Sequence, residues 1–310
     1  MLTGNWELTA EKTDWRGVTL YRARHLESGE EYLLEDLALA ASAKDKIYRQ
    51  IALGLAEFLR MAQEIEHPAL RRPLDLTRQG EKYFLVRPMD PLLWDSWGPE
   101  PVPADPEELG RWLLTMAEVL AVYHEKGLTT RGIARTDLVR TATGIIVLEP
   151  LCQSYLAGYR DRELSTRHEF APEVASGKEW GQAADLFTLG LNAYLLATER
   201  LPFPGRGPEF IAALLSTQPV DPRAYAPTLG PEPARTLLGL LAREPQARPT
   251  AVALAATLRA QAEGGKFVAT PAEREDFARR GRPMVELVER RQRFRLFLRR
   301  YRGGLLVGLG

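Results

Sequence analysis

The stretch that most constrains the fold of this chain is residues 183–203. Its apolar side chains do not keep to one stripe but cover every face of a 3.6-residue helix. A helix that is apolar on all sides lies at the centre of a large domain or spans a membrane. A span needs about 20 uninterrupted apolar residues, whereas Asp185 and Asn192 interrupt this run before Pro202 ends it. We therefore expect a core helix with other helices packed around it.

Length and composition are compatible with one two-lobed domain or two small ones. The 310 residues are 45% apolar and 26% charged, which is typical of a soluble globular protein. The single Cys152 excludes a disulfide framework and fits a reducing cytoplasm. No apolar run follows Met1, so we expect no secretory signal peptide.

Motifs around the core helix resemble landmarks of the protein kinase catalytic domain. The helix opens with Asp185, continues with Leu189-Gly190 and closes with Leu-Pro-Phe203. Ala171-Pro-Glu173 lies where that family has its APE motif, and residues 241–250 resemble its late D/E-P-x-x-R-P-S/T motif. Their order and spacing are similar to those of the protein kinase family, and the tail described below adds a resemblance to bacterial Ser/Thr kinases of the receptor type. The resemblance implies an α+β, two-lobed kinase-like fold, with a small antiparallel N-lobe sheet plus one helix and a mainly helical C-lobe.

The rest of the chain has its predicted strands and helices in the order of a kinase domain. Residues 6–37 alternate like a small antiparallel sheet with a turn at Glu27-Ser-Gly29, and residues 44–65 have apolar side chains at helical spacing. Several prolines between residues 88 and 103 predict a stiff, non-helical connection between lobes. The predicted parts are a kinase-like N-lobe at 1–90, a kinase-like C-lobe at 91–262 and a basic helical tail at 263–310.

The resemblance identifies the positions that hold ATP in a kinase. A glycine-rich loop covers the phosphates, because residues without Cβ let backbone N–H groups approach them. The matching positions here are Thr13, Trp15, Gly17 and Val18. The loop keeps one glycine, Gly17, and the bulky indole of Trp15 stands where the family needs space for the phosphates. Glu35 stands where the third strand supplies a lysine to the phosphates. A carboxylate there repels a triphosphate.

The catalytic loop and the metal positions also depart from the family. Gly132 replaces the aspartate that accepts the substrate proton, and Ala134 replaces the lysine that follows it. Asp137 stands where an asparagine holds a second Mg²⁺, and Glu149 stands where the metal-binding aspartate of DFG lies. These two acids are the weak metal candidates, and two solvated carboxylates at strand ends are the alternative.

The losses favour a pseudokinase, a catalytically inactive kinase-like domain that acts as a protein-binding or regulatory scaffold and holds no cofactor. The residues with structural roles in the family are present. Glu173 and Arg248 match a buried ion pair, and Asp185 matches the aspartate that holds the catalytic-loop backbone. The alternative is an atypical nucleotide-binding enzyme or an ATP sensor, with weak phosphoryl or nucleotidyl transfer through Asp137, Glu149 and a divalent metal.

The tail has its own chemistry. Residues 279–310 hold ten Arg, no Lys and two acids, so the tail carries +8 and residues 1–278 carry −8. An apolar stripe runs through it at helical spacing: Met284, Leu287, Phe294, Leu298 and Tyr301. Residues 279–302 therefore resemble a juxtamembrane helix that meets anionic lipid, followed by what looks like the start of a span. A surface helix docked on the C-lobe and a dimerisation seam are the alternatives.

We expect the partners to be proteins and not nucleic acid: a partner kinase, a reader of phosphorylated loops or envelope proteins. Ser165 and Thr166 lie in the activation-segment equivalent and are candidate phospho-acceptors. Bacterial receptor kinases place the kinase domain, a juxtamembrane segment and a single span in that order. The resemblance thus implies a cytoplasmic location, tethered to the inner face of the membrane.

Overall fold

The computed structural model of the chain contains two compact units. The sheet unit consists of Met1–Pro101 and Val122–Arg167, and the helix unit consists of Val102–Ala121 and His168–Gly310. The domain limits predicted at residues 90 and 262 stay a prediction. The residues that the structure describes are 5–13, 18–37, 53–54, 65–80, 82–91, 94, 105–130, 138–141, 144–148, 170–205, 208–283, 285–287 and 289–290.

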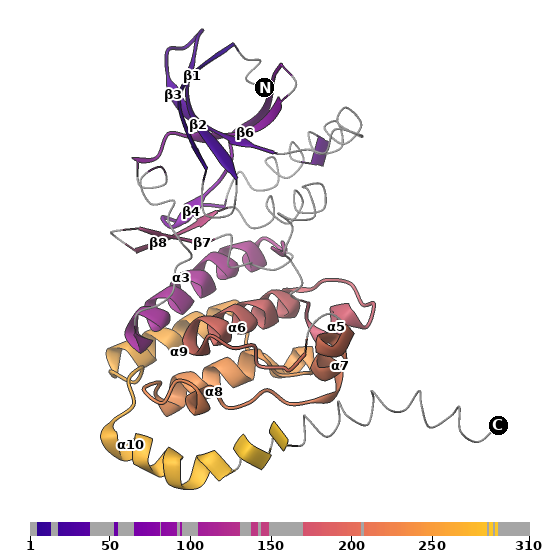
Figure 1. Cartoon of the computed structure of the whole chain (residues 1–310), viewed down its shortest axis with the longest axis vertical. Helices are drawn as coiled ribbons and strands as arrows, with labels where there is room; N and C mark the ends of the chain where they lie inside the picture. The colour runs from indigo at the N-terminus through magenta and orange to yellow at the C-terminus, as the bar shows by residue number, and fades with distance from the viewer. Residues whose placement is uncertain are drawn as a thin grey trace, which may run out of the picture. The chain divides into compact units, whose positions relative to one another are not determined.

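The sheet unit is built on a five-stranded antiparallel sheet with the strand order β1-β2-β3-β6-β5 (Figure 1). Its strands are β1 (Trp6–Thr13), β2 (Thr19–His25), β3 (Glu31–Asp36), β5 (Asp75–Gln79) and β6 (Lys82–Pro88). The predicted turn between β2 and β3 contains Gly29 with φ of 73°, a left-handed conformation that favours glycine. A second sheet has the order β4-β8-β7 and is formed by β4 (Leu70–Arg71), β7 (Leu138–Thr141) and β8 (Gly144–Leu148).

An aromatic cluster covers one face of the five-stranded sheet. Its buried members are Trp6, Tyr21, Ala23, Leu34, Phe84 and Val86. Tyr21 and Phe84 meet edge to face with ring centroids 5.6 Å apart, and Trp6 Nε1 donates a hydrogen bond of 3.1 Å to Thr77 Oγ1. Successive residues of a strand face opposite sides of a sheet. Leu20, Arg22, Leu33 and Glu35 therefore lie on the other face.

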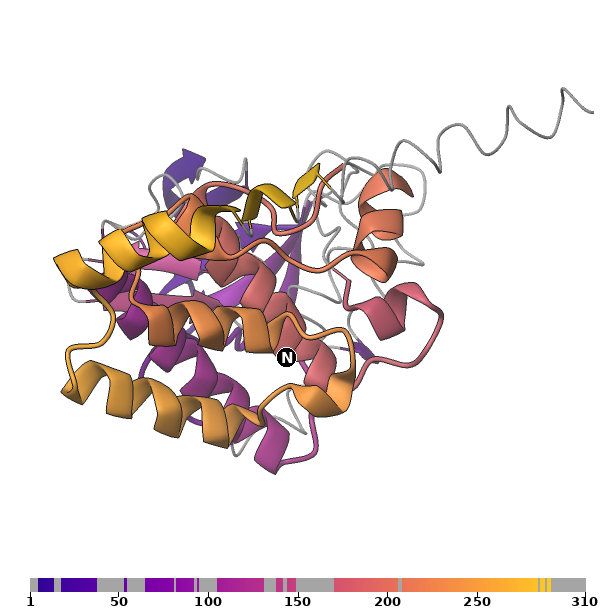
Figure 2. The same ribbon diagram turned by 90° about the horizontal axis from the view of Figure 1, so that it is seen from below.

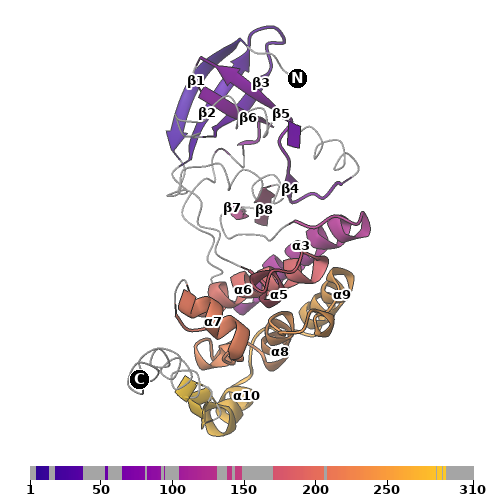
Figure 3. The ribbon, with the colours of Figure 1, turned by 90° about the vertical axis from the view of Figure 1, so that its right-hand side faces the viewer.

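The helix unit contains most of one long helix and a stack of shorter ones. In the three views of Figures 1 to 3, α8 (Pro231–Leu240) lies between α9 (Ala251–Glu263) and α10 (Pro271–Asp276). The helices are α3 (Pro106–Glu125), α5 (Pro172–Ala175), α6 (Gln182–Thr198), α7 (Pro208–Ser216), α8 (Pro231–Leu240), α9 (Ala251–Glu263) and α10 (Pro271–Asp276), with a π-helical turn at Phe277–Gly281 and 3₁₀ turns at Pro222–Ala224 and Pro245–Ala247.

Helix α6 is the expected core helix. Thirteen of its 17 residues are buried, and they lie on all of its faces. It ends at Glu199, whose φ of 55° is left-handed and whose N–H donates to the carbonyl of Leu195. Helix α8 crosses it closely, because a Cβ built on Gly190 would lie 2.7 Å from Cβ of Leu240. The absence of a side chain at Gly190 is what permits this crossing.

The first part of the tail is docked on the helix unit. Arg223 lies over the ring of Phe277 at 4.4 Å, and the hydroxyl of Tyr225 donates a short hydrogen bond to the carboxylate of Glu289. Val285 is buried, whereas Leu287 of the predicted stripe is 41% exposed. Leu287 therefore lies off the docked face, and the apolar stripe stays a prediction. Its other members lie outside the described residues.

Among the described helices, none combines the length and the apolar character that a membrane crossing requires. The helix predicted at 44–65 lies almost wholly outside the described residues.

The crossing of α6 and α8 gives a matched pair of glycine variants. We expect Gly190→Ala to lower the free energy of unfolding by about 1–2 kcal/mol, since the added methyl overpacks a buried contact. Gly239, on α8, has open space around its Cβ position, so Gly239→Ala should raise the free energy of unfolding by about 0.5–1 kcal/mol. Urea denaturation of both variants measures the difference. Equal effects of the two substitutions would contradict the close crossing.

Candidate functional site

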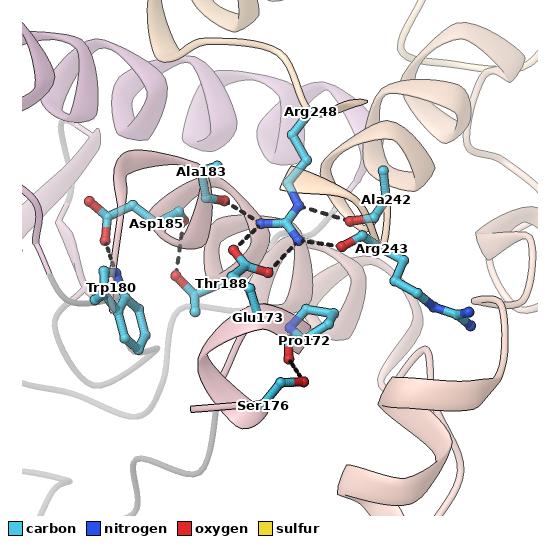
Figure 4. Close-up of polar contacts among 10 residues, drawn as sticks. All are labelled: Pro172, Glu173, Ser176, Trp180, Ala183, Asp185, Thr188, Ala242, Arg243 and Arg248. Atoms are coloured by element: carbon cyan, nitrogen blue, oxygen red, sulfur yellow. Dashed lines mark hydrogen bonds and ion pairs between the residues drawn. The ribbon is translucent and has the colours of Figure 1, made fainter. Parts of the chain in front are cut away.

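Glu173 and Arg248 form a buried, bidentate ion pair in the helix unit (Figure 4). Nη1 of Arg248 lies 2.7 Å from Oε1 of Glu173, and Nη2 lies 2.8 Å from Oε2. The Arg248 side chain is 0% exposed and that of Glu173 is 8% exposed. The pair joins the start of α5 to the segment that precedes α9.

The rest of the Arg248 guanidinium is bonded to backbone carbonyls. Nη1 also donates to the carbonyl of Ala183 at 2.7 Å. Nε donates to Ala242 at 2.8 Å, and Nη2 donates to Arg243 at 3.0 Å. A guanidinium has five N–H groups, and each has an acceptor here. We call Arg248, Glu173 and these three carbonyls the Arg248 cluster. It ties α5, the start of α6 and the segment that follows α8 together.

Asp185 is fully buried near the start of α6. Its Oδ1 accepts a hydrogen bond of 2.7 Å from Nε1 of Trp180, and its backbone carbonyl accepts one of 2.9 Å from Thr188 (Figure 4). The catalytic-loop equivalent that the resemblance assigns to it lies outside the described residues. Its predicted role in holding that loop stays a prediction.

Glu35 is not a free carboxylate that faces solvent. It is 0% exposed, and Oε2 accepts a hydrogen bond of 2.9 Å from Nε of Arg87 on β6. Arg87 is 1% exposed and also donates from Nη1 to the carbonyl of Arg71 at 3.2 Å. Sequence reasoning missed Arg87. The signal was a single charged residue at the end of the apolar run Tyr83–Val86.

Strand register gathers further cations on the face that carries Glu35. One row of partners runs through Lys12, Leu20, Glu35 and Leu85. The adjacent row runs through Arg22, Leu33 and Arg87. Directly paired residues of antiparallel strands share a face. We call these positions the cationic face, because its two rows hold Lys12, Arg22 and Arg87 against the one acid Glu35.

Trp94 covers two of these cations. The carbonyl of Trp94 accepts a hydrogen bond of 2.9 Å from Nζ of Lys12, which lies 6.0 Å from the centre of the indole. Cζ of Arg22 lies 5.3 Å from the same ring. Cation–π contacts of this kind contribute about 0.5–1 kcal/mol each at exposed sites. The indole therefore holds both positive side chains against the same surface.

The remaining predicted positions are only partly described. Thr13 ends β1, and Val18 is buried just before β2. The described residues contain no group of three or more acids, histidines or cysteines that could hold a metal. Several predicted positions lie outside the described residues and stay predictions: Trp15, Gly17, Gly132, Ala134, Asp137, Glu149, Ser165 and Thr166.

The Arg248 cluster predicts a large loss of stability on neutralisation. Glu173→Gln leaves a fully buried guanidinium without its counter-ion, which typically costs about 3–5 kcal/mol. Glu118→Gln is the control, since Glu118 pairs with Arg259 on the surface at 2.7 Å and exposed pairs contribute about 0–1 kcal/mol. Thermal and urea unfolding of the two variants test this. Similar losses from both would show that the buried pair has no special role.

Known proteins resemble this chain in sequence and in fold, although no protein-family model matches it. It is 30% identical to the serine/threonine-protein kinase pkn2 of Myxococcus xanthus over 65% of this chain and 26% of that protein. It is 28% identical to the DNA damage-responsive serine/threonine-protein kinase RqkA of Deinococcus radiodurans over 84% of this chain and 40% of that protein. The chain thus spans less than half the length of these relatives.

A solved structure shows the fold. The kinase domain of Mycobacterium tuberculosis PknI superposes with a TM-score of 0.58 at 18% identity, over 83% of this chain and 95% of that one. The antiparallel sheet and the mainly helical unit match the α+β kinase fold expected from the sequence, so that prediction is confirmed.

One prediction is wrong. The chain was expected not to be an enzyme, but the relatives at 28% and 30% identity are named serine/threonine protein kinases and the fold is that of a kinase domain. The prediction rested on the combined loss of the glycine-rich loop, the strand lysine and the catalytic aspartate, and it took Glu35 as an isolated carboxylate. In the structure a buried arginine neutralises Glu35, with two further cations on the same face. The chain therefore has the two-lobed α+β fold of the protein kinases, and its curated relatives include bacterial serine/threonine protein kinases.

Proposed function

We propose that this chain is a kinase-type enzyme that binds ATP and transfers its terminal phosphoryl group to a serine or threonine hydroxyl. The observation that carries the proposal is the likeness to a named serine/threonine-protein kinase over 84% of the chain, together with the kinase fold. The Arg248 cluster is compatible with it, because its buried ion pair stands at the positions that the resemblance to the kinase family assigns to one.

The altered residues are compatible with slow transfer. Phosphoryl transfer passes through a loose transition state, so most of the catalysis comes from positioning and from neutralisation of charge. ATP is the substrate here. Asp137 and Glu149 offer the carboxylate oxygens that Mg²⁺ or Mn²⁺ prefers, and a bound divalent ion would neutralise part of the phosphate charge. Because Gly132 cannot accept the proton of the substrate hydroxyl, we expect turnover below the roughly 1–100 s⁻¹ of kinases with a catalytic base.

A regulatory role at a membrane is a second part of the proposal. Its support is the charge of the tail, where residues 279–310 hold ten Arg against two acids. Clusters of arginine bind anionic headgroups with about 1 kcal/mol for each residue near the surface. The docking of Glu289 on Tyr225 fixes the start of this segment on the helix unit. Partner proteins and phosphorylation at Ser165 or Thr166 belong to the same proposal.

The test is phosphoryl transfer by the full chain. Incubation with γ-labelled ATP, Mn²⁺ or Mg²⁺ and a general protein acceptor should label serine and threonine slowly. Asp137→Asn and Glu149→Gln should each lower the rate at least tenfold, since each removes a ligand charge from the metal. Glu125→Gln, an exposed acid at the end of α3, should leave the rate unchanged.

A trace of contaminating kinase would label the acceptor equally in all four proteins. Equal labelling by the wild type and by both acid variants would therefore contradict the proposal, as would the absence of labelling from the wild type.

A further inference from the structure

The guanidinium of Arg87 is buried but only partly satisfied. Its side chain is 1% exposed, with Nε bonded to Glu35 and Nη1 to the carbonyl of Arg71. Nη2 is buried and has no hydrogen-bond acceptor within the part of the chain that the structure describes. A buried donor without an acceptor costs about 1–3 kcal/mol. Arg248, by contrast, has an acceptor for every N–H.

A second guanidinium on the same face is in a similar state. Nε of Arg22 is buried and lacks an acceptor within the described residues. Arg22 and Arg87 are both register partners of Leu33, which lies between them on β3. Adjacent strands lie about 4.8 Å apart, so the backbones of the two arginines are separated by two such spacings, about 10 Å. Their long side chains can therefore reach one ligand.

The charge of this face favours an anion. Lys12, Arg22 and Arg87 stand against Glu35, so the two rows of the cationic face carry +2. Two opposite charges buried together are stabilised only if their remaining hydrogen-bonding groups are satisfied. Glu35 bonds only to Nε of Arg87, and the buried Nη2 lacks an acceptor among the described residues. A phosphate oxygen could serve as the acceptor for Nη2 of Arg87 and Nε of Arg22, because arginine N–H groups bind phosphate well.

We propose that the cationic face binds the polyphosphate of the nucleotide, with Arg22 and Arg87 as its anchors and Lys12 as a third positive charge. Glu35 is then the counter-ion that positions Arg87, not a group that repels the phosphates. This inference rests on the proposed function. It adds that Arg22, Arg87 and Lys12 supply the positive charge that a lysine on the third strand supplies in the kinase family.

Binding of a polyphosphate to the cationic face should not require a divalent metal. Arginine stays charged at every accessible pH, and the three cations lie on fixed strands. The face should therefore bind a polyphosphate without a divalent ion, whereas transfer through Asp137 and Glu149 needs one. Binding in a chelator and transfer with metal can thus be measured separately.

The experiment is calorimetric titration of the full chain with ATP and with inorganic tripolyphosphate, in EDTA at low salt. The variants are Arg22→Met and the double variant Glu35→Gln/Arg87→Met, which removes both buried charges together. Arg24→Met is the matched control, because Arg24 lies on the same strand but is half exposed beside Glu7. Circular dichroism and melting temperature establish that each variant is folded.

We expect wild type to bind both ligands, the two variants to bind each at least tenfold more weakly, and Arg24→Met to stay within twofold of wild type. Affinity unchanged in the folded variants would overturn the inference, and so would an equal loss in Arg24→Met or no binding by wild type.

The two proposals fail in different ways. If wild type transfers phosphate from ATP while the variants keep full affinity, the cationic face is not the anchor and the proposed function stands. If tripolyphosphate binding depends on Arg22 but no transfer occurs with metal, the polyphosphate site stands and the proposed function falls.

Discussion

The buried guanidinium of Arg248 is the interaction on which the helix unit depends. Removing a charged group from water costs several kcal/mol, and that cost is recovered only when a counter-ion and good hydrogen bonds replace the water. Glu173 and three carbonyls supply all of these bonds. Because the acceptors come from α5, α6 and the segment that follows α8, the three segments have one arrangement relative to one another.

The sheet unit contains a second buried arginine with the opposite property. Arg87 also pairs with a buried glutamate, yet two of the three nitrogens of its guanidinium have acceptors among the described residues and the third does not. A fully satisfied buried guanidinium rigidifies a fold, whereas a buried donor without an acceptor costs free energy that a ligand could recover. This contrast separates a structural ion pair from a candidate binding site in a chain where both consist of Glu and Arg.

How much the sequence predicts depends on how far apart the interacting residues lie. The core helix α6 is predicted from its apolar pattern alone, since apolar residues on every face of a helix indicate that it is buried. The pair of Glu35 with Arg87 joins residues 52 positions apart, and no local pattern in β3 reports the register of β6. Glu35 was consequently predicted as a repelling carboxylate, which was one of several altered positions behind the prediction of an inactive protein. The docked face of the tail is a related case, since only the docking partner decides that Val285 faces inward.

The most direct test of the cationic face is a crystal structure of the chain with a non-hydrolysable ATP analogue, grown without divalent metal. We expect phosphate oxygens at about 2.7–3.2 Å from the guanidinium groups of Arg22 and Arg87, with Glu35 still paired to Arg87. Phosphates bound away from both arginines, or an Nη2 of Arg87 satisfied by a protein acceptor, would contradict it.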